Sequence, residues 1–515
     1  MTNNRIQKVV IVGGGTAGWI TASALSRVLG KEQVSITLIE SDQISTIGVG
    51  EATIPPIRDF HRMLGLSEAD FVRRTQATFK LGIEFSNWGV DGSSYFHPFG
   101  EYGREFDSVA FHHYWMRGKS IDNEPGHNSG HGAGNNVGHL DQYSLCAVAA
   151  KAGKFAPNSN DPNSILSAIG YAYHFDASLY AQLLSEYSQA LGVRRIEGMV
   201  CSVEQQSDSG FIESVTLESK QVVEGDLFID CTGFSALLID KTLGVEFEDW
   251  GHYLPCDRAL AVQTENTEAS ILPYTKSIAH AAGWQWRIPL QHRTGNGVVY
   301  SSNYMTDEQA KAQLMENIAG EIISEPKSIK FRTGKRRQSW SKNCIAIGLS
   351  SGFLEPLEST SIHLIQTAVS RLLTLFPGQE FDQADIAEYN NGVNQELDFI
   401  RDFIILHYHA NQRPEPMWKH CREMQITESL KHKIQLFENR ARLFDDRYDL
   451  FKSASWLAVM QGQGIQARYY HPIVEGKSSV RLLQLLADMR GAFAQAVAEM
   501  PDHEKFILDN CKAAK

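Results

Sequence analysis

Three glycines near the N-terminus have the spacing of a dinucleotide-binding motif, Gly13-x-Gly15-x-x-Gly18. The first glycine permits a tight turn, the second lets the backbone approach a pyrophosphate, and the third lets a helix pack closely on a strand. The start of that helix offers unpaired N–H groups to the phosphate charge. Glu40 follows at the position where an acid accepts hydrogen bonds from ribose hydroxyls. The chain is therefore predicted to bind FAD or NAD, which share this half-site.

Two tryptophans, Trp284 and Trp286, occupy alternate residues of a segment that ends at Pro289. On a strand, alternate side chains point to the same face, so the two indoles can form a flat apolar wall. Such a wall can keep a substrate away from a flavin. The alternative is that both are ordinary half-buried sheet residues, since aromatic residues are enriched in strands.

The elements that must position these residues alternate between strand and helix. We predict a buried strand at 8–12, a helix at 19–29 and a second strand at 34–39 that ends at Glu40. Strand, glycine turn, helix, strand and acid is the Rossmann order, so the fold class is α/β. A later apolar strand at 227–230 ends in Asp230-x-Thr232-Gly233, which resembles the second nucleotide-proximal strand of FAD-binding oxygenases. That resemblance favours FAD over NAD.

The C-terminal part is predicted to be helical from about residue 395. Leucines at 436, 443, 450 and 457 recur at heptad intervals. We expect residues 1–395 to form the cofactor-binding core, with 396–515 packed on it and contributing to the substrate pocket. The segment 117–140 is rich in Gly, Asn and His and is predicted to be a loop, with a mobile lid as the alternative. Glycines around His127 and His131 make a helix there improbable, so we expect no metal site.

Composition excludes several classes of protein. The net charge of −12, from 60 acidic and 48 basic residues, gives no electrostatic footprint for nucleic acid. Seven cysteines without a Cys-x-x-Cys pair fit reduced thiols in a cytoplasmic protein better than disulfides or zinc. No secretory signal and no 18-residue apolar run are present, so no membrane association is expected.

Several motifs together are similar to those of flavin-dependent halogenases of the tryptophan-halogenase family. Besides Trp284-x-Trp286-x-x-Pro289, the segment 48–55 matches the family's Gly-x-Gly-Glu-Ala-Thr-x-Pro, and Glu358-Ser359-Thr360 matches its Glu-Ser-Thr. The resemblance spans about residues 8–362 with the motifs in family order. It implies a Rossmann-type FAD-binding fold of the flavin monooxygenase and halogenase kind with a C-terminal helical part.

The resemblance assigns the catalytic roles to Lys80 and Glu358. Lys80 would hold hypohalous acid by hydrogen bond or as a haloamine, and Glu358 would polarise the oxidant or remove the ring proton. The alternative for Lys80 is a solvated helical lysine paired with Glu84. Halide would be bound by the backbone amides of Thr360 and Ser361 at a helix start, although Ser359 or Thr360 could also be an N-cap.

The remaining site residues also follow from the resemblance. His97 and Phe99 would sandwich the aromatic ring, although a loop packed by its own aromatics is the alternative. The other substrate candidates are Pro98 and Ser359. The residues implied to contact FAD are Gly13, Gly15, Thr16, Ala17, Gly18, Glu40, Gly50, Glu51, Ala52, Val200, Asp230, Leu349 and Ile362.

The implied activity is FADH2-dependent halogenation. A separate flavin reductase would supply FADH2, and O2 and bromide or chloride would give hypohalous acid that travels to Lys80. Tryptophan-specific members carry a Tyr-Tyr pair in the C-terminal region, and the matching stretch 440–451 lacks one. We therefore expect a small, electron-rich, indole-like aromatic rather than free tryptophan. Ser361 stands where several tryptophan-specific members have glycine, which raises the hypothesis that bromide outperforms chloride.

Three other functions stay open on the residues alone. A flavin-dependent aromatic hydroxylase without halide use shares the fingerprint and Asp230-x-Thr232-Gly233, but it does not explain Lys80 together with the tryptophan pair. A redox-only flavoprotein would not need Lys80, and an NAD enzyme would bind no flavin. The assembly state is also open, with a homodimer as one candidate.

Overall fold

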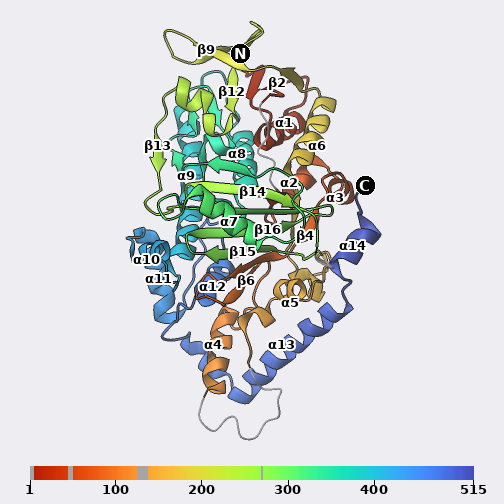
Figure 1. Cartoon of the computed structure of the whole chain (residues 1–515), viewed down its shortest axis with the longest axis vertical. Coiled ribbons are helices and arrows are strands. Elements are labelled where there is room, and N and C mark those ends of the chain that lie inside the picture. Colours follow the sequence, from red (N-terminus) through yellow and green to blue (C-terminus); the bar gives the residue numbers. More distant parts are fainter. Residues whose placement is uncertain (1–4, 44–49, 124–136, 268–270, 515) are drawn as a thin grey trace.

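The computed structural model describes residues 5–43, 50–123, 137–267 and 271–514 (Figure 1). The predicted loop histidines His127 and His131, and Gly48 and Val49 of the glycine motif, lie outside the described residues. The N-terminus and the first sheet lie at one end of the elongated molecule, and helices α4 (Phe111–Asp122) and α13 (Ser479–Glu499) lie at the other.

The Rossmann sheet contains the predicted strands. Its order is β20 (Trp340–Ser341), β21 (Cys344–Ala346), β12 (Leu227–Asp230), β1 (Lys8–Val12), β2 (Ser35–Glu40) and β8 (Arg194–Glu197). β1 runs parallel to both β2 and β12. Four of its five residues are buried, as expected for a central parallel strand covered on both faces. The predicted strand–turn–helix–strand order is confirmed, with α1 (Thr16–Leu29) beginning three residues earlier than expected.

A seven-stranded sheet carries the tryptophan pair. Its order is β18 (Lys327–Lys330), β14 (Arg258–Thr264), β17 (Thr294–Tyr300), β16 (Gly283–Pro289), β15 (Thr275–His280), β5 (Gly82–Ser86) and β6 (Ser94–Pro98). The predicted strand at 283–289 is β16, which is confirmed. His97 lies on β6, so the segment predicted as a possible aromatic loop is an edge strand of this sheet.

Three small sheets complete the β-structure. They are β3 (Gly50–Ala52), β7 (Ala172–Asp176) and β4 (Thr78–Lys80); β11 (Val222–Glu224), β10 (Ile212–Leu217) and β9 (Val200–Gln205); and β13 (Phe247–Asp249), β19 (Gly334–Arg336) and β22 (Gly352–Phe353). Lys80 ends β4, an edge strand that pairs with β7 alone. The helical setting considered for Lys80 is therefore wrong, because β7 recruits this segment into a sheet from nearly a hundred residues away.

Helices cover the sheets. Besides α1, α4 and α13 they are α2 (Ile57–Leu64), α3 (Glu68–Arg74), α5 (Leu145–Lys151), α6 (Ala177–Ala190), α7 (Asp307–Asn317), α8 (Ser361–Thr374), α9 (Gln383–His409), α10 (Pro416–Glu423), α11 (Glu428–Arg440), α12 (Ser453–Gly462) and α14 (His503–Asn510). At 1.5 Å per residue α9 is about 40 Å long. Tyr389 near its start packs on Trp340 of the Rossmann sheet, and His407 near its end reaches the seven-stranded sheet at Phe85.

Two expectations about the helical part need correction. The four heptad leucines do not share one helix: Leu436 lies on α11 and Leu457 on α12, while Leu443 and Leu450 lie in the irregular stretch between them. Ala441 adopts a left-handed conformation that ends α11, which breaks the repeat. The predicted loop at 117–140 is helical up to Asp122, because α4 extends into it. Residue 396, the predicted domain boundary, lies inside α9, and the division stays a prediction.

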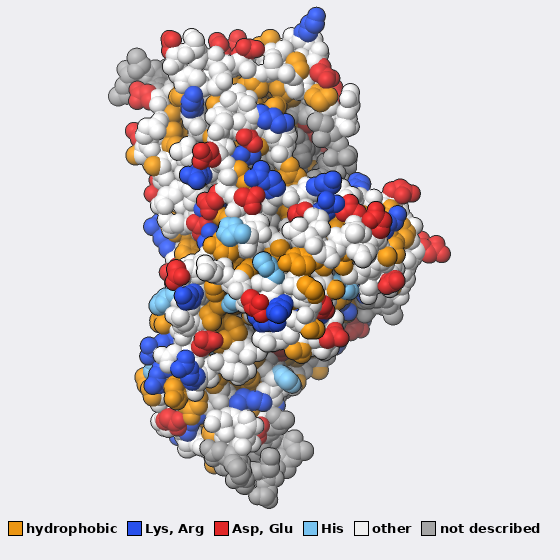
Figure 2. Space-filling model, turned by 60° about the vertical axis from the view of Figure 1, so that its left-hand side comes forward, with side chains coloured by type: hydrophobic (Ala, Val, Ile, Leu, Met, Phe, Trp, Pro, Cys, Tyr) orange, Lys and Arg blue, Asp and Glu red, His pale blue; other side chains and the backbone are white. Residues whose placement is uncertain are grey.

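Surface charge is mixed on the face in Figure 2, where Lys and Arg side chains are interspersed with Asp and Glu. That face has no uninterrupted basic surface of the kind that nucleic acid requires.

Of the helices in the described ranges, none combines the length and the apolar character needed to cross a bilayer.

Candidate active site

A cavity of about 680 Å³ lies where the Rossmann strands end, between the seven-stranded sheet and helices α8 and α9. Its volume suits a large cofactor. Gly13 has a φ of +108°, which favours glycine, and Gly15 faces open space where a Cβ would project into the cavity. A Cβ on Gly18 would lie 1.9 Å from the carbonyl oxygen of Gly13, so this glycine permits the predicted close helix–strand packing. The cradle therefore fits the pyrophosphate of FAD.

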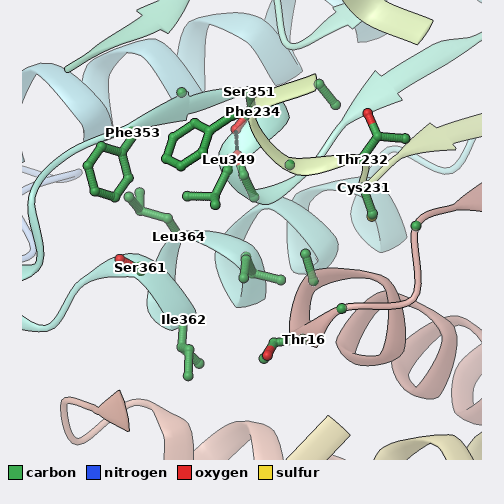
Figure 3. A pocket seen from close by; sticks show the side chains of 18 of the residues that line it. Thr16, Cys231, Thr232, Phe234, Leu349, Ser351, Phe353, Ser361, Ile362 and Leu364 are labelled. Atoms are coloured by element: carbon green, nitrogen blue, oxygen red, sulfur yellow. Dashed lines mark hydrogen bonds between the residues drawn. The ribbon is translucent and has the colours of Figure 1, made fainter. Parts of the chain in front are cut away.

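Most residues predicted to contact FAD line this cavity, as Figure 3 illustrates for Thr16 and Ile362. The lining includes Gly13, Gly15, Thr16, Ala17, Glu40, Glu51, Ala52, Val200, Leu349 and Ile362. Asp230 lies behind the wall, where its carboxylate accepts hydrogen bonds from the backbone of Thr232, Leu238 and Ile239. It orders the turn whose Cys231 and Thr232 form the wall. A direct contact between Asp230 and FAD stays a prediction.

Glu40 enters the cavity with two partners. Its carboxylate accepts hydrogen bonds from Arg195 at 2.5 Å and from the indole of Trp19 at 3.3 Å. These contacts fix the carboxylate at the end of β2 and leave acceptor capacity for a ribose hydroxyl, because a carboxylate has about four lone-pair sites. Glu51 also lines the cavity, and burial together with the Asp176 carboxylate raises its pKa to about 7.

The two tryptophans contribute to the cavity wall, and their separating role stays a prediction. Trp284 and Trp286 both line the cavity, with ring centroids 6.1 Å apart. Trp286 lies over Gly297 on the neighbouring strand, where an added Cβ would come within 2.0 Å of the indole. A glycine at that position lets the ring lie flat against the sheet. Sharing one face, as alternate strand residues do, the two indoles form one side of the cofactor cavity.

Lys80 is completely buried. Its ammonium donates hydrogen bonds to the carbonyl oxygen of Thr53 at 3.0 Å and to the hydroxyl of Ser359 at 2.9 Å. Burial lowers the pKa of Lys80 to about 7, against the opposing effect of the Glu358 carboxylate. The solvated lysine paired with Glu84 is thus excluded, since Glu84 lies on β5 and accepts a hydrogen bond from Ser86. A buried amine with this pKa is neutral in a large fraction near neutral pH.

Glu358 is also fully buried and meets two histidines. Its carboxylate lies 2.9 Å from Nδ1 of His97 and 2.8 Å from Nε2 of His407. The His97 contact is a hydrogen bond, and the His407 contact is a close approach of its ring nitrogen to the same carboxylate. Although burial raises the pKa of Glu358, His97 and His407 lower it to about 2. Glu358 is therefore a carboxylate at all ordinary pH values.

A polar chain continues behind His407. Its Nδ1 lies 3.0 Å from the hydroxyl of Tyr95, and that oxygen accepts a hydrogen bond from the Gln463 amide at 3.2 Å. Burial lowers the pKa of His407, against the opposing effect of the Glu358 carboxylate. These three residues were missed from the sequence, because α9, β6 and the end cap of α12 meet only in the folded chain and no local motif marks them.

The start of α8 suits an anion. Its N-cap is Thr360, whose side chain makes no capping hydrogen bond, and within the described chain the buried Thr360 hydroxyl has no partner. No described group accepts a hydrogen bond from the backbone N–H of Thr360 or Ser361. Free amides and the positive end of a 14-residue helix favour a halide ion. Ser361 lines the cofactor cavity, so an ion held there would face it.

Aromatic side chains gather beside these polar groups. The Lys80 ammonium lies 5.0 Å from the ring centre of Phe99, and the His97 ring lies 5.8 Å from Phe403 and 6.1 Å from Phe451. Pro98 is buried at the end of β6 between His97 and Phe99. Phe403 and Phe451 come from the C-terminal part and were missed, since nothing in their local sequence marks them.

Ser359 joins the two halves of the site. It lines the cofactor cavity, and its hydroxyl accepts the hydrogen bond from Lys80. Its φ of +60° is uncommon for a residue other than glycine. The structure thus brings the buried amine, the carboxylate and the free helix amides together on consecutive residues 358–361 and the end of β4, and of these residues Ser359 and Ser361 line the cavity.

A cationic residue in the wall was also missed. Arg371 on α8 lines the cavity and binds Glu396 of α9 at 2.5 Å.

In the described part of the chain, no group of three or more His, Cys, Asp or Glu side chains could hold a metal ion. The absence of a metal from the working enzyme stays a prediction.

The chain resembles known proteins over nearly its whole length. The family model described as tryptophan halogenase matches residues 8–479. A tryptophan 6-halogenase from Streptomyces toxytricini is 36% identical over 478 residues, which cover 90% of each chain.

Solved structures agree with this match. A flavin-dependent halogenase from Brevundimonas sp. BAL3 superposes with a TM-score of 0.92 at 46% identity, covering 98% of this chain and 99% of that one. Another, from Xanthomonas campestris, superposes with a TM-score of 0.93 at 45% identity, covering 99% of both chains. The predicted fold class is confirmed.

Proposed function

This chain belongs to the tryptophan halogenase family, and from that premise we propose that it halogenates a small, indole-like aromatic ring by passing hypohalous acid to Lys80. It is a flavin-dependent halogenase that uses FADH2, O2 and a halide ion. The observation that carries the proposal is the burial of Lys80, with its amine bound to a serine of the cofactor cavity wall. The hydroxylase alternative is not favoured, because the relatives are halogenases.

The cofactor, bound as FADH2, supplies the electrons that reduce O2 as halide is oxidised to hypohalous acid. In this proposal the amides of Thr360 and Ser361 hold the halide at the cavity wall, and the two tryptophans keep the aromatic substrate on the other side. Lys80 then binds hypohalous acid by hydrogen bond, or reacts with it to give a haloamine and water. Transfer of the halogen from the haloamine to the ring, with uptake of one proton by the nitrogen, restores the amine, and Glu358 takes the ring proton, so that no net proton is consumed.

We assign the ring-binding surface to His97, Pro98, Phe99 and Ser359. Stacking on His97 and Phe99 would place a flat ring beside both Lys80 and Glu358. Free tryptophan is not the proposed substrate, because the stretch 441–452 between α11 and α12 is irregular and contains no Tyr-Tyr pair to grip an amino acid. The proposed substrate is an indole-like aromatic that lacks the amino and carboxylate groups of an amino acid.

The test is turnover with FAD, a flavin reductase, O2, a panel of indoles and either halide. Ring-halogenated products, identified by mass, are expected for some members of the panel. A product that gains one oxygen and no halogen would overturn the proposal in favour of a hydroxylase. Competition between bromide and chloride at equal concentrations tests the proposed preference for bromide, which a dominant chlorinated product would contradict.

The cellular setting is also proposed. We infer that a separate flavin reductase supplies FADH2 and that the protein acts in the cytoplasm as a homodimer. Among the described residues none of the seven cysteines forms a disulfide, which fits a reducing compartment. Sedimentation of the purified protein would test the homodimer.

Turnover should rise with pH through about 7. The pKa of Lys80 is lowered to about 7, so the amine is mostly protonated below that value and mostly neutral above it. A haloamine requires the neutral form. Protonation of Glu358 does not affect the pH dependence of kcat above pH 5, because the pKa of Glu358 is about 2. The pH dependence of kcat should therefore have an acidic limb near 7, and a flat profile from pH 5 to 8 would contradict the haloamine route.

Opening the tryptophan wall should change the product. Trp286→Ala removes the indole that lies over Gly297. The substitution is therefore expected to join the cofactor cavity to the space behind the tryptophan pair. Substrate that reaches the flavin directly is expected to take up oxygen, so hydroxylated product should appear while halogenated product falls severalfold. Trp250→Phe, at a buried tryptophan outside the cavity lining, is the control. An unchanged product ratio in Trp286→Ala would argue against a separating role.

A further inference from the structure

The C-terminal segment contacts the residues that lead into Lys80. In Figure 1, α14 and the C-terminus lie beside α3 and β4. Arg73 at the end of α3 donates to the carbonyl oxygen of Asn510 at 3.1 Å, and Gln76 donates to that of Ala514 at 3.3 Å. These partners are more than 400 residues apart in the chain, so the contact exists only in the folded protein.

His503, the first residue of α14, bonds directly to the strand of Lys80. The backbone N–H of Phe79 donates to Nε2 of His503 at 3.1 Å, and Nδ1 of His503 lies 2.7 Å from the carbonyl oxygen of Ile271. An amide can only donate and a carbonyl can only accept, so the ring must be neutral with its hydrogen on Nδ1. Burial lowers the pKa of His503 to about 4, which keeps it neutral.

This bond satisfies a buried, unpaired sheet edge. β4 has β7 on one side only, so the N–H of Phe79 would otherwise be a buried donor without an acceptor. A three-residue edge strand has few ladder bonds to hold it. His503 supplies the missing acceptor at the residue immediately before Lys80.

A second link runs through Gln291. Its amide nitrogen donates to the carbonyl oxygen of Ala77 at 2.7 Å, and its amide oxygen accepts from the backbone N–H of Ala513 at 2.8 Å. The C-terminal tail therefore orients the side chain that holds the residue before β4.

Aromatic packing reinforces the same place. The ring of Phe79 stacks on Phe155 at 4.2 Å and meets Phe506 of α14 edge-on at 5.4 Å. Phe506 also packs on Phe155 at 5.0 Å. Packing of the three rings fixes the face of β4 opposite to the one from which Lys80 projects.

We propose that residues 503–514 form a C-terminal clasp that fixes β4 and so places the Lys80 amine against Ser359, with His503 as its main positioning residue. This inference rests on the proposed role of Lys80 in carrying the oxidant. The amine is held by two hydrogen bonds of 2.9 and 3.0 Å, and an error of about 1 Å in a reacting group costs about a hundredfold in rate. A loosened strand would therefore release oxidant without halogenating the ring.

The test compares His503→Leu with His503→Gln in the full-length protein. Leucine removes both bonds, whereas the glutamine amide can accept from Phe79 and donate to Ile271. The measurements are halogenated product per FADH2 oxidised, FADH2 affinity, and hydrogen exchange of the peptide that spans Phe79. For His503→Leu we expect product per FADH2 to fall at least about tenfold, with faster exchange and unchanged FADH2 affinity. His503→Gln should recover most of the product, and His420→Leu at an exposed site of α10 should match the unchanged protein.

Ala513→Pro keeps the test decisive if His503→Leu does not fold. Proline removes the N–H that orients Gln291 without changing the core, and product per FADH2 should fall in the same direction by a smaller factor. The clasp would be overturned if a folded His503→Leu variant formed the normal amount of halogenated product per FADH2. If the leucine variant is unfolded, the same result in Ala513→Pro would overturn it. Lys80→Ala separates this failure from that of the proposed function: if it keeps full product, Lys80 carries no oxidant whatever the clasp does.

Discussion

Replacing Lys80 with alanine is expected to lower halogenated product by about a thousandfold or more, while FADH2 oxidation continues. The amine is the buried group that reaches Ser359 of the cavity wall, and it lies 5.0 Å from the ring of Phe99. Without it, hypohalous acid has no group that holds it beside the substrate. Product and consumed FADH2 are measured together, and the escaping oxidant is trapped with a soluble thioether.

A second buried lysine provides the control. Lys335 is 5% exposed and binds Asp398 at 2.8 Å, outside the cavity lining. Lys335→Ala should cost stability without changing the product formed per FADH2. An equal loss of product per FADH2 in both variants would mean that the Lys80 result reflects a general structural defect rather than loss of oxidant transfer.

Lys80→Arg separates the two ways in which the amine could act. Arginine stays protonated at all ordinary pH values, so it can hydrogen-bond hypohalous acid but cannot form the haloamine. Product within about tenfold of the unchanged protein would favour the hydrogen bond, whereas a loss as large as that of alanine would favour the haloamine. Thermal unfolding checks that the larger side chain is accommodated.

The parts of the fold that were predictable from the sequence are those set by local geometry. Gly13, Gly15 and Gly18 act within six residues of one another, so their spacing alone identifies the Rossmann turn. Trp284 and Trp286 share a face because strand side chains alternate, whatever the rest of the chain does. The heptad leucines misled because a periodic pattern cannot reveal the left-handed residue Ala441 that ends α11.

The parts that could not be predicted depend on contacts between distant segments. β4 is a strand because β7 pairs with it, and the sequence around Lys80 carries no alternation long enough to indicate this. His407 meets Glu358 only because α9 runs about 40 Å from the Rossmann sheet to the site. The contact of His503 with Phe79 spans 424 residues. Such pairings are decided by packing, which motifs do not encode.

Glu358→Gln is expected to lower kcat by about 10²- to 10⁴-fold, the range for loss of a positioned proton-transfer group. Glutamine keeps the volume of the side chain and removes its charge. The carboxylate is held ionised by His97 and His407, and no other carboxylate in the described chain contacts His97. Because the loss falls on the chemical step, KM for the aromatic should change little, and a kcat and KM measurement with one substrate resolves the two.

Glu355→Gln is the matched control, since Glu355 lies three residues earlier and is equally buried. Burial raises the pKa of Glu355 to about 7, so a large fraction of it is neutral at pH 7, where Glu358 is charged. The amide replaces a group that gains little from its charge, and activity within a few-fold of the unchanged protein is expected. If Glu355→Gln were as inactive as Glu358→Gln, the loss would come from disturbing the turn at 355–361. If Glu358→Gln kept normal kcat, the ring proton would leave by another base, and His97, which we propose stacks on the same ring, would be the next residue to replace.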